Sequence, residues 1–392
     1  QHTAMSRMSE LGELIKFLEA RAGLDRSLEY LPTVDELADR ISKDSGLTRP
    51  ELAVLTSYMK MYLKSELARS DFIDDEYLTP YLYSAFPPIL VSEYGSKVLE
   101  HRLRREITAT QLANNIVNLV GPSFVYRKIE YTGASPGDVI KAAVIAKDLF
   151  AIDEKLEAIE ALDYQISADV QRIMIQRLMQ LMRRVTRWIL RNRRGQLHLG
   201  ATVAEFSAVI RQTESLLLAA LPAGIRDRFE KTRSEYIKNR VPESLASRIA
   251  AVDFIYPTLA IVEICKITAV SPKTALQVYF ALGDQLQITA IRQSINDLGV
   301  SNSWQALARK SFQDDLDWQQ RALTQNVIVS MGGRKNIKAA VASWCDSHAE
   351  QVARTQQIIN SIQLGDKSDY AMFSVVLREL LNLAQSTTSY YD

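Results

Sequence analysis

The stretch from His101 to Arg127 reads HRLRREITATQLANNIVNLVGPSFVYR, and it predicts an α-helix with a defined end. Its apolar residues recur at intervals of three and four, which places them on one face of a helix. The pair Gly121-Pro122 follows, and such a pair is typical of the point where a helix stops. The stretch therefore favours a helical fold in which this segment covers a core.

Signals for the start of a helix recur along the rest of the chain. In a capping box, a Thr and a Glu three residues later satisfy amide groups that the first turn leaves free. A serine directly before proline is a second start signal. The capping-box pairs are Thr33 with Glu36, Thr48 with Glu51, and Thr202 with Glu205, and the serine-proline pairs are Ser135-Pro136 and Ser271-Pro272. We therefore predict an all-α fold, in which one of the helices runs from Asn336 to Ser361.

Composition bounds the class of protein. The 392 residues include 47 basic and 46 acidic side chains, and this balance disfavours a general nucleic-acid or membrane-surface binder. Only two cysteines are present, and no apolar run approaches the roughly 18 residues of a membrane span. We expect a cytoplasmic protein. Residues 1–6 are interpreted as a vector-derived scar.

Two segments of the chain resemble each other at an offset near 136 residues. The segment that begins at Thr132 aligns without a gap on the one that begins at Thr268, so that Ser135-Pro136 meets Ser271-Pro272. One interpretation is a duplicated helical unit, roughly 101–220 and 240–362, because a repeated unit can bury a core by stacking on its copy. The alternative is that amphipathic helices with serine-proline starts resemble one another in any case.

The search for catalytic and binding motifs predicts no catalytic, cofactor or metal site. The sequence has no G-x-G or Walker-type loop, which a nucleotide site at a helix start requires. No histidine has a second histidine or cysteine at the spacing of metal ligands. Gly332-Gly333 precedes Arg334 and Lys335, and we favour a plain turn there over an anion cradle.

Two groups of arginines are the candidate interface. Arg102, Arg104 and Arg105 lie at the start of a helix, where positive charge is unfavourable beside the helix dipole, so we expect an acidic partner from another helix or domain. Arg184, Arg187 and Arg191 share a helical face beside Trp188. A phosphate contact would suit arginine chemistry, but the dipole at a helix end and acidic neighbours explain these cations more simply.

Five stretches, in this order, carry a family resemblance. They are GLTRPELAVLTSYMKMYLKSEL from Gly46, HRLRREITATQLANNIVNLVGPSFVYRKIEYTGAS from His101, LEAIEALDYQIS from Leu156, RRVTRWILRNRRG from Arg183, and SWQALARKSFQDDLDWQQRALT from Ser303. From about Met8 to about Leu383 the chain resembles the C-terminal part of the large-type, NAD-specific glutamate dehydrogenase of bacteria. It departs from that pattern at His101-Arg102 and at Thr258-Leu259-Ala260.

The resemblance implies a non-catalytic fragment of a longer enzyme. In that family a regulatory region and a dehydrogenase domain precede the helical C-terminal part, and the enzyme oxidises L-glutamate to 2-oxoglutarate and ammonia with NAD. Its catalytic lysine and aspartate and its nucleotide loop would lie before Gln1, so we expect this chain alone to be inactive and without a cofactor.

The resemblance also sets the expected organisation and partners. We expect a helical segment over 7–45 that follows the catalytic domain, a first helical unit over 46–230 and a second over 231–392. The expected partners are the upstream dehydrogenase domain and other subunits, with no nucleic acid and no membrane. The alternative is a stand-alone helical scaffold that binds other proteins.

Overall fold

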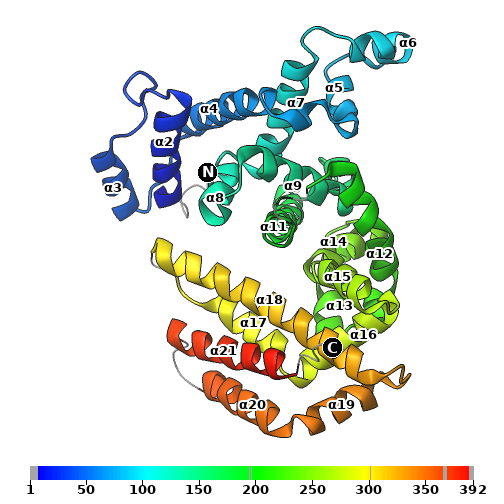
Figure 1. The fold of residues 1–392 in the computed structure, drawn as a ribbon. Helices are drawn as coiled ribbons and strands as arrows, with labels where there is room; N and C mark the ends of the chain where they lie inside the picture. Colours follow the sequence, from blue (N-terminus) through cyan, green and yellow to red (C-terminus); the bar gives the residue numbers. More distant parts are fainter. Residues whose placement is uncertain (1–7, 194, 196, 301, 365–368, 388–392) are drawn as a thin grey trace. The chain divides into compact units, whose positions relative to one another are not determined.

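The structure is a computed structural model that describes residues 8–193, 195, 197–300, 302–364 and 369–387. Within these ranges the chain forms twenty α-helices and two 3-10 helices, and no strand (Figure 1). The prediction of an all-α fold is confirmed. Residues 1–6, which were interpreted as a scar, lie outside the described part of the chain.

The helices belong to two compact units. Unit 1 comprises Gln1–Asp153 and Leu178–Val203, and unit 2 comprises Glu154–Arg177 and Ala204–Asp392. The elements wholly in unit 1 are α2 (Met8–Ala22), α3 (Val34–Ser42), α4 (Arg49–Ala68), η1 (Asp71–Asp74), η2 (Glu76–Leu78), α5 (Thr79–Tyr83), α6 (Pro88–Leu99), α7 (Arg104–Val120), α8 (Ser123–Thr132) and α9 (Pro136–Leu149).

Three helices contribute residues to both units, and the rest belong to unit 2. The shared helices are α10 (Ile152–Glu160), α11 (Ala168–Asn192) and α12 (Leu199–Ala220). The helices of unit 2 are α13 (Ala223–Lys238), α14 (Glu243–Ile255), α15 (Thr258–Thr268), α16 (Pro272–Gln285), α17 (Ile288–Asp297), α18 (Ser303–Met331), α19 (Ile337–Ser347), α20 (Ala349–Leu364) and α21 (Tyr370–Ser386). The predicted domain boundaries after residues 45 and 230 stay predictions.

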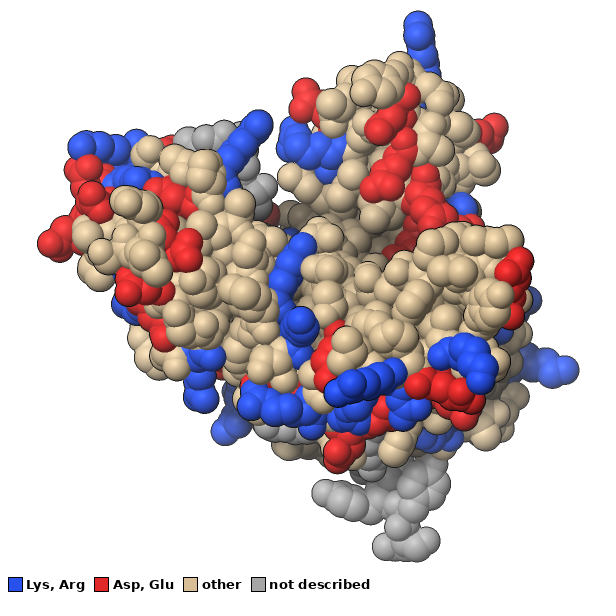
Figure 2. Space-filling model, turned by 90° about the horizontal axis from the view of Figure 1, so that it is seen from above, with Lys and Arg blue, Asp and Glu red and all other residues tan. Residues whose placement is uncertain are grey.

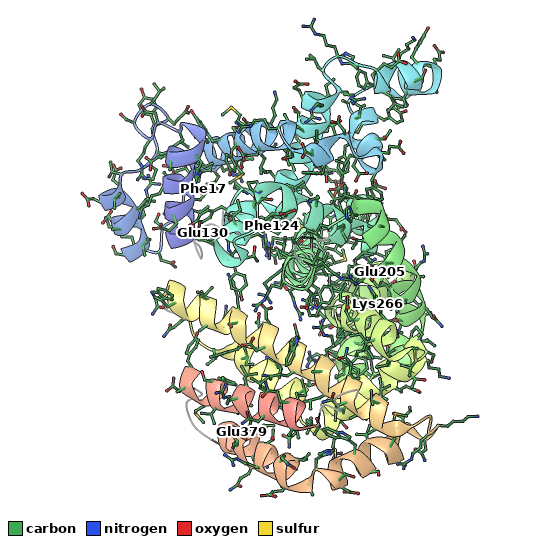
Figure 3. All side chains as sticks on the ribbon, in the orientation of Figure 1. Phe17, Phe124, Glu130, Glu205, Lys266 and Glu379 are labelled. Atoms are coloured by element: carbon green, nitrogen blue, oxygen red, sulfur yellow. The ribbon has the colours of Figure 1, made fainter. Side chains whose placement is uncertain are left out.

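The core of unit 1 is built around α4, α7 and α9. On α4 a stripe of residues four apart, Leu55, Met59, Leu63 and Leu67, is fully buried, and this helix packs on α2, α7 and α9. Helix α9 is buried around most of its circumference from Val139 to Ala146, which is the pattern of a helix enclosed by others. At the edge of this core the ring of Phe17 lies 5.2 Å from Tyr62 and 5.1 Å from Tyr126, centroid to centroid, so it joins α2 to α4 and α8 (Figure 3).

Helix α16 has the same enclosed position in unit 2. It packs on α15, α17, α18 and α19, and its residues from Ala275 to Gly283 are largely buried. A shift of 136 residues carries the bounds of α9 onto those of α16, and the first residue of α10 onto that of α17. Ser135 and Ser271 both accept a hydrogen bond as N-caps. The series α8 to α11, with 10, 14, 9 and 25 residues, thus parallels the series α15 to α18, with 11, 14, 10 and 29 residues.

Four of the five predicted helix starts are confirmed, and one is wrong. Capping boxes form at Thr33 and Thr48, and the two serine caps are present. The box predicted at Thr202 does not form, because α12 already begins at Leu199. The Glu205 carboxylate instead pairs with Lys266 Nζ of α15 at 3.0 Å (Figure 3).

The helix predicted from Asn336 to Ser361 is two helices. The break falls at His348, where φ is −121° and ψ is 31°. The imidazole Nδ1 lies 2.8 Å from the carbonyl oxygen of Trp344, and the indole and imidazole rings pack 4.8 Å apart. This local bond takes up a carbonyl of the last turn of α19, so α20 starts anew at Ala349.

No single helix of the described residues is long and apolar enough to span a membrane. Only α14 and α15 taken together, bent by 59° where they meet, reach that length and hydropathy.

Candidate interface site

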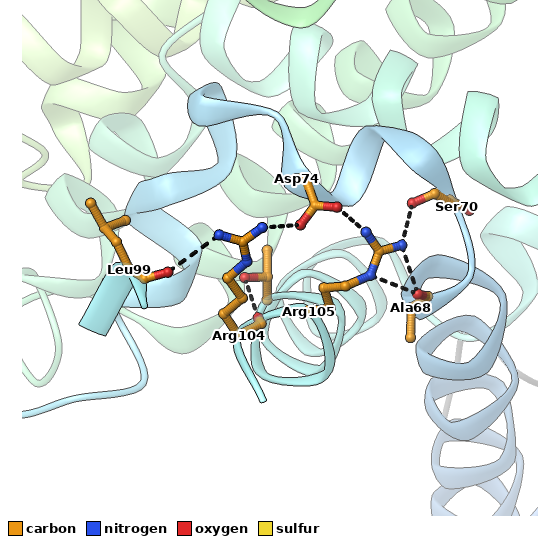
Figure 4. A network of polar contacts seen from close by, with 7 residues as sticks. Ala68, Ser70, Asp74, Leu99, Arg104 and Arg105 are labelled. Atoms are coloured by element: carbon orange, nitrogen blue, oxygen red, sulfur yellow. Dashed lines mark hydrogen bonds and ion pairs between the residues drawn. The ribbon is translucent and has the colours of Figure 1, made fainter. Parts of the chain in front are cut away.

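The first arginines of α7 meet one acid from η1. Arg104 Nη2 donates to Asp74 Oδ1 at 3.2 Å, and Arg105 Nη1 donates to Asp74 Oδ2 (Figure 4). We call Asp74, Arg104 and Arg105 the arginine clamp. The expectation of an acidic partner from another helix is met inside unit 1.

The arginine clamp also holds the carboxyl ends of two helices. Arg105 donates from Nε and Nη2 to the carbonyl oxygen of Ala68, the last residue of α4, at 3.3 and 3.1 Å. It donates to Ser70 O at 3.2 Å, while Arg104 donates to the oxygen of Leu99, which ends α6, at 3.4 Å (Figure 4). Carbonyls at a helix end carry partial negative charge, which stabilises a cation there. This contact offsets the unfavourable position of both arginines at the start of α7.

Arg102 differs from its two neighbours. It is exposed, and among the described residues it makes no ion pair or hydrogen bond. Of the first group of candidate interface residues, Arg102 is thus the one that makes no such contact, whereas Arg104, although exposed, and Arg105 join helices of unit 1. Whether these residues meet a partner stays a prediction.

The second group of arginines faces helix α8. Arg187 is 6% exposed, and its guanidinium lies 5.8 Å from the centre of the Tyr131 ring. Arg191 Nη1 donates to the Tyr131 hydroxyl at 3.3 Å, and Trp188 is buried. Arg184 is half-buried. On the face of α11 predicted from the sequence, Arg187 and Trp188 are therefore packed inside unit 1, whereas Arg191 is exposed. The view in Figure 2 shows both basic and acidic patches on the surface.

A buried polar cluster that the sequence analysis missed joins the same part of unit 1. Lys147 of α9 is 5% exposed, and its Nζ donates to Asp153 Oδ2 at 2.6 Å and to Asn115 Oδ1 at 3.3 Å. The ammonium lies 4.8 Å from the centre of the Tyr81 ring. Beside it, the Tyr77 hydroxyl donates to Asp148 Oδ2 at 2.6 Å. We call this the Lys147 cluster. It ties η2 and α5 to α9.

The pKa values of the Lys147 cluster follow from this arrangement. Burial alone would lower the pKa of Lys147, but Tyr81 and Asp153 outweigh it and hold the pKa above the ordinary 10.5. Burial raises the pKa of Tyr81 to about 12. Burial also raises the pKa of Asp148, although its hydrogen bond with Tyr77 acts in the other direction. The cluster therefore keeps Lys147 charged and both tyrosines neutral at physiological pH.

Two asparagines of α7 have different surroundings. Asn115 Oδ1 accepts from the Lys147 ammonium, whereas Asn118 is exposed. The signal that could have revealed the Lys147 cluster is a lysine within an apolar run, since a lysine on an enclosed helix requires a charged or aromatic partner.

Unit 2 has a buried network of its own. Arg292 of α17 forms an ion pair with Asp317 of α18 and donates from Nη2 to Gln320 Oε1 at 3.1 Å. The amide nitrogen of Gln320 donates to the carbonyl oxygen of Tyr279 on α16 at 3.2 Å. This network joins three helices through the ion pair of Arg292 and the side-chain amide of Gln320, which supports a structural role.

The described residues hold no group of three or more His, Cys, Asp or Glu side chains arranged as for a metal ion. Burial raises the pKa of Cys265 to about 11 and also raises the pKa of Cys345, so neither thiol is activated as a thiolate. Gly332 and Gly333 both have positive φ and end α18, which is the plain turn that we favoured.

These features define an all-α region in which charged side chains join helix ends and enclosed helices. A model of the family described as glutamate dehydrogenase, C-terminal, matches residues 44–382. The chain belongs to this family.

Three curated relatives carry the name NAD-specific glutamate dehydrogenase. The Pseudomonas aeruginosa protein is 42% identical over 387 residues, which cover 99% of this chain and 24% of that protein. The Halomonas elongata protein is 37% identical over 374 residues, 95% of this chain and 23% of its own length. The Mycobacterium tuberculosis protein is 29% identical over 373 residues, with 95% and 23% covered. The chain thus spans about a quarter of the length of these relatives.

Proposed function

We propose that the chain is the non-catalytic C-terminal part of a long NAD-dependent glutamate dehydrogenase. The observation that carries this proposal is the match of 99% of the chain to 24% of a relative with that name. The whole enzyme would convert L-glutamate, NAD and water to 2-oxoglutarate, ammonia and NADH in the cytoplasm. NAD would bind elsewhere in the long polypeptide, and this part would support the dehydrogenase domain or join subunits.

The contacts of the candidate site support an architectural role. The arginine clamp and the Lys147 cluster are used within unit 1 to fix helices to one another, and neither offers a nucleophile beside a base. A protein partner has an apolar surface to meet on α6. Ile89 is 62% exposed and Tyr94 is 53% exposed on this helix, and large apolar side chains exposed on one element are typical of interaction sites. The same surface would serve the alternative, a stand-alone helical scaffold.

We also propose that the two matching series of helices arose by duplication. Helices α9 and α16 have the same length, begin and end 136 residues apart, and are both capped by a serine, which supports this. An experimental structure in which α8 to α11 cannot be superposed on α15 to α18 would contradict it.

Co-purification tests the proposed partner. We expect the tagged chain to retain the dehydrogenase segment of the same long polypeptide through size-exclusion chromatography. A variant with Ile89→Ser and Tyr94→Ser should retain less, whereas Ile267→Ser should not, because Ile267 is 61% exposed on α15 of the other unit. If the unaltered chain does not retain the dehydrogenase segment, the scaffold alternative is favoured. If all variants retain the segment equally, α6 is not the contact surface.

The Lys147 cluster gives a pH-dependent prediction. The Tyr81 hydroxyl is buried and has no hydrogen-bond partner among the described residues, so Tyr81→Phe should leave the free energy of unfolding at neutral pH unchanged or raise it. Above the ordinary pKa of 10.0 the unfolded tyrosine ionises while the folded one, with a pKa of about 12, stays neutral. Stability is therefore lost as the pH rises.

The size of this effect can be measured by urea denaturation. Between about pH 9 and about pH 11 the contribution of Tyr81 to the free energy of unfolding should fall by roughly 1.4 kcal/mol. The free energy of unfolding of Tyr81→Phe should therefore decrease less over this pH range than that of the unaltered chain. Tyr94→Phe is the matched control, since Tyr94 is exposed. Equal alkaline losses in the unaltered chain and in Tyr81→Phe would show that the hydroxyl titrates normally.

A further inference from the structure

Helices α18 and α21 of unit 2 border an open groove with a volume of about 330 Å³. This volume lies at the lower end of the range of small-molecule sites. The groove is distinct from the arginine clamp and the Lys147 cluster, which belong to unit 1. It is lined by aromatic and aliphatic side chains together with one amide, one carboxylate and one guanidinium.

The buried polar group of the groove is Gln319. Its side chain belongs to a residue only 4% exposed, and its Nε2 donates to the carbonyl oxygen of Leu377 at 2.7 Å, which fixes the direction of the amide. The amide oxygen Oε1 has no hydrogen-bond partner among the described residues. A buried acceptor without a partner lowers stability, and a donor from a bound molecule would remove that cost.

The apolar walls of the groove are aromatic. Phe312 is held by two rings of α21, with centroids 6.0 Å from Tyr370 and 6.3 Å from Phe373. Trp318 is 45% exposed, which is unusual for so large an apolar side chain on a packed helix. Phe312, held in place by its neighbours, and Trp318, which faces solvent, together suit the aromatic ring of a small ligand.

The charges of the groove are of both signs. Arg378 is exposed and makes no ion pair or hydrogen bond with the described residues. Its neighbour Glu379 pairs instead with Arg354 of α20 at 3.2 Å (Figure 3). On α18 the Asp315 carboxylate, which also lines the groove, accepts from Ser311 Oγ at 3.4 Å. The groove therefore offers a guanidinium for a carboxylate and acceptors for an ammonium group.

We propose that this groove binds a free aromatic amino acid. Its carboxylate meets Arg378, its ammonium group donates to Asp315 and to Gln319 Oε1, and its ring packs between Phe312 and Trp318. The carboxylate, the ammonium group and the ring each have a separate partner in the groove. A ligand that lacks any one of these three groups should therefore bind more weakly. The proposal is independent of any role of the chain in a dehydrogenase.

Calorimetric titration of the full chain with L-phenylalanine tests this site. We expect saturable binding of one equivalent. 3-Phenylpropionate lacks the ammonium group and 2-phenylethylamine lacks the carboxylate, and each should bind at least roughly tenfold more weakly, as expected for the loss of a charge-assisted hydrogen bond. The variant Arg378→Gln should weaken L-phenylalanine binding by a similar factor, and Trp318→Ala should weaken it as well.

Arg211→Gln is the matched control, because Arg211 is an exposed cation of α12 outside the groove. It should bind L-phenylalanine as the unaltered chain does. No saturable binding up to about 20 mM, weaker than almost any specific site, would overturn the proposal. Unchanged binding by Arg378→Gln would also overturn it, and equal affinity for 3-phenylpropionate would refute the role of the two ammonium acceptors.

Discussion

Replacing Arg105 with alanine lowers the free energy of unfolding by roughly 2 to 3 kcal/mol, because one guanidinium supplies an ion pair and three backbone hydrogen bonds. Its loss leaves the last carbonyl of α4 without its guanidinium donors and the oxygen of Ser70 with the Ile73 amide alone, and it leaves Asp74 with Arg104 alone. The side chains of Arg105 and Asp74 are each about a third exposed, at 36% and 35%, so solvent screening keeps the ion pair itself a minor part of this loss.

Chemical denaturation and amide exchange measure the effect of Arg105→Ala. Exchange should rise at the end of α4 and in η1, where the lost hydrogen bonds lie. Arg105→Lys should recover only part of the stability, since an ammonium concentrates its donors on one atom and cannot reproduce the planar fork by which Nε, Nη1 and Nη2 reach Ala68, Ser70 and Asp74. Arg102→Ala is the matched control and should be neutral. If Arg105→Ala is as stable as Arg102→Ala, the arginine clamp does not hold these helix ends.

Replacing Asp153 with alanine should have the second large effect. Lys147 would remain buried without its carboxylate, at a cost of roughly 2 to 3 kcal/mol near neutral pH, because an unpaired buried charge is strongly unfavourable. Lys147→Met should cost less than about 1 kcal/mol, because it removes the buried charge and keeps the volume. The Asp153 left behind is harmless, since its side chain is 49% exposed.

The double variant separates the two contributions. Lys147→Met with Asp153→Ala should be more stable than Asp153→Ala alone, because the charge that requires a partner is then absent. Equilibrium urea denaturation near neutral pH gives all three values. A cost of Lys147→Met equal to that of Asp153→Ala would mean that the ion pair is itself a net source of stability, which contradicts the account of a buried cation held by its partners.

Local chemistry made much of the fold predictable. The caps at Thr33, Thr48, Ser135 and Ser271 bond to an amide three residues later, so sequence spacing alone reveals them. The capping box at Thr202 failed because α12 begins earlier, at Leu199, and Glu205 pairs with Lys266, which lies 61 residues away in the chain. A local pattern cannot predict which of two partners a side chain meets when one depends on tertiary packing.

The candidate site was predictable in part. The unfavourable charge at the start of α7 indicated that Arg104 and Arg105 needed an acid, but the choice of Asp74 depends on how η1 folds against α7. The Lys147 cluster was missed because its members come from η2, α5, α7, α9 and α10, and no spacing in the sequence links them. The family assignment needed no such geometry, since it rests on long stretches of matching sequence.

The central claim is that this chain supports a dehydrogenase without performing catalysis itself. The most direct test is an assay of NAD-linked glutamate oxidation by the dehydrogenase segment of the same polypeptide, with and without an equimolar amount of this chain. We predict no turnover by the chain alone, and a higher rate or a longer active lifetime of the dehydrogenase segment when the chain is present. Turnover by the purified chain alone, or a dehydrogenase segment that is equally active and equally durable without it, would contradict the account.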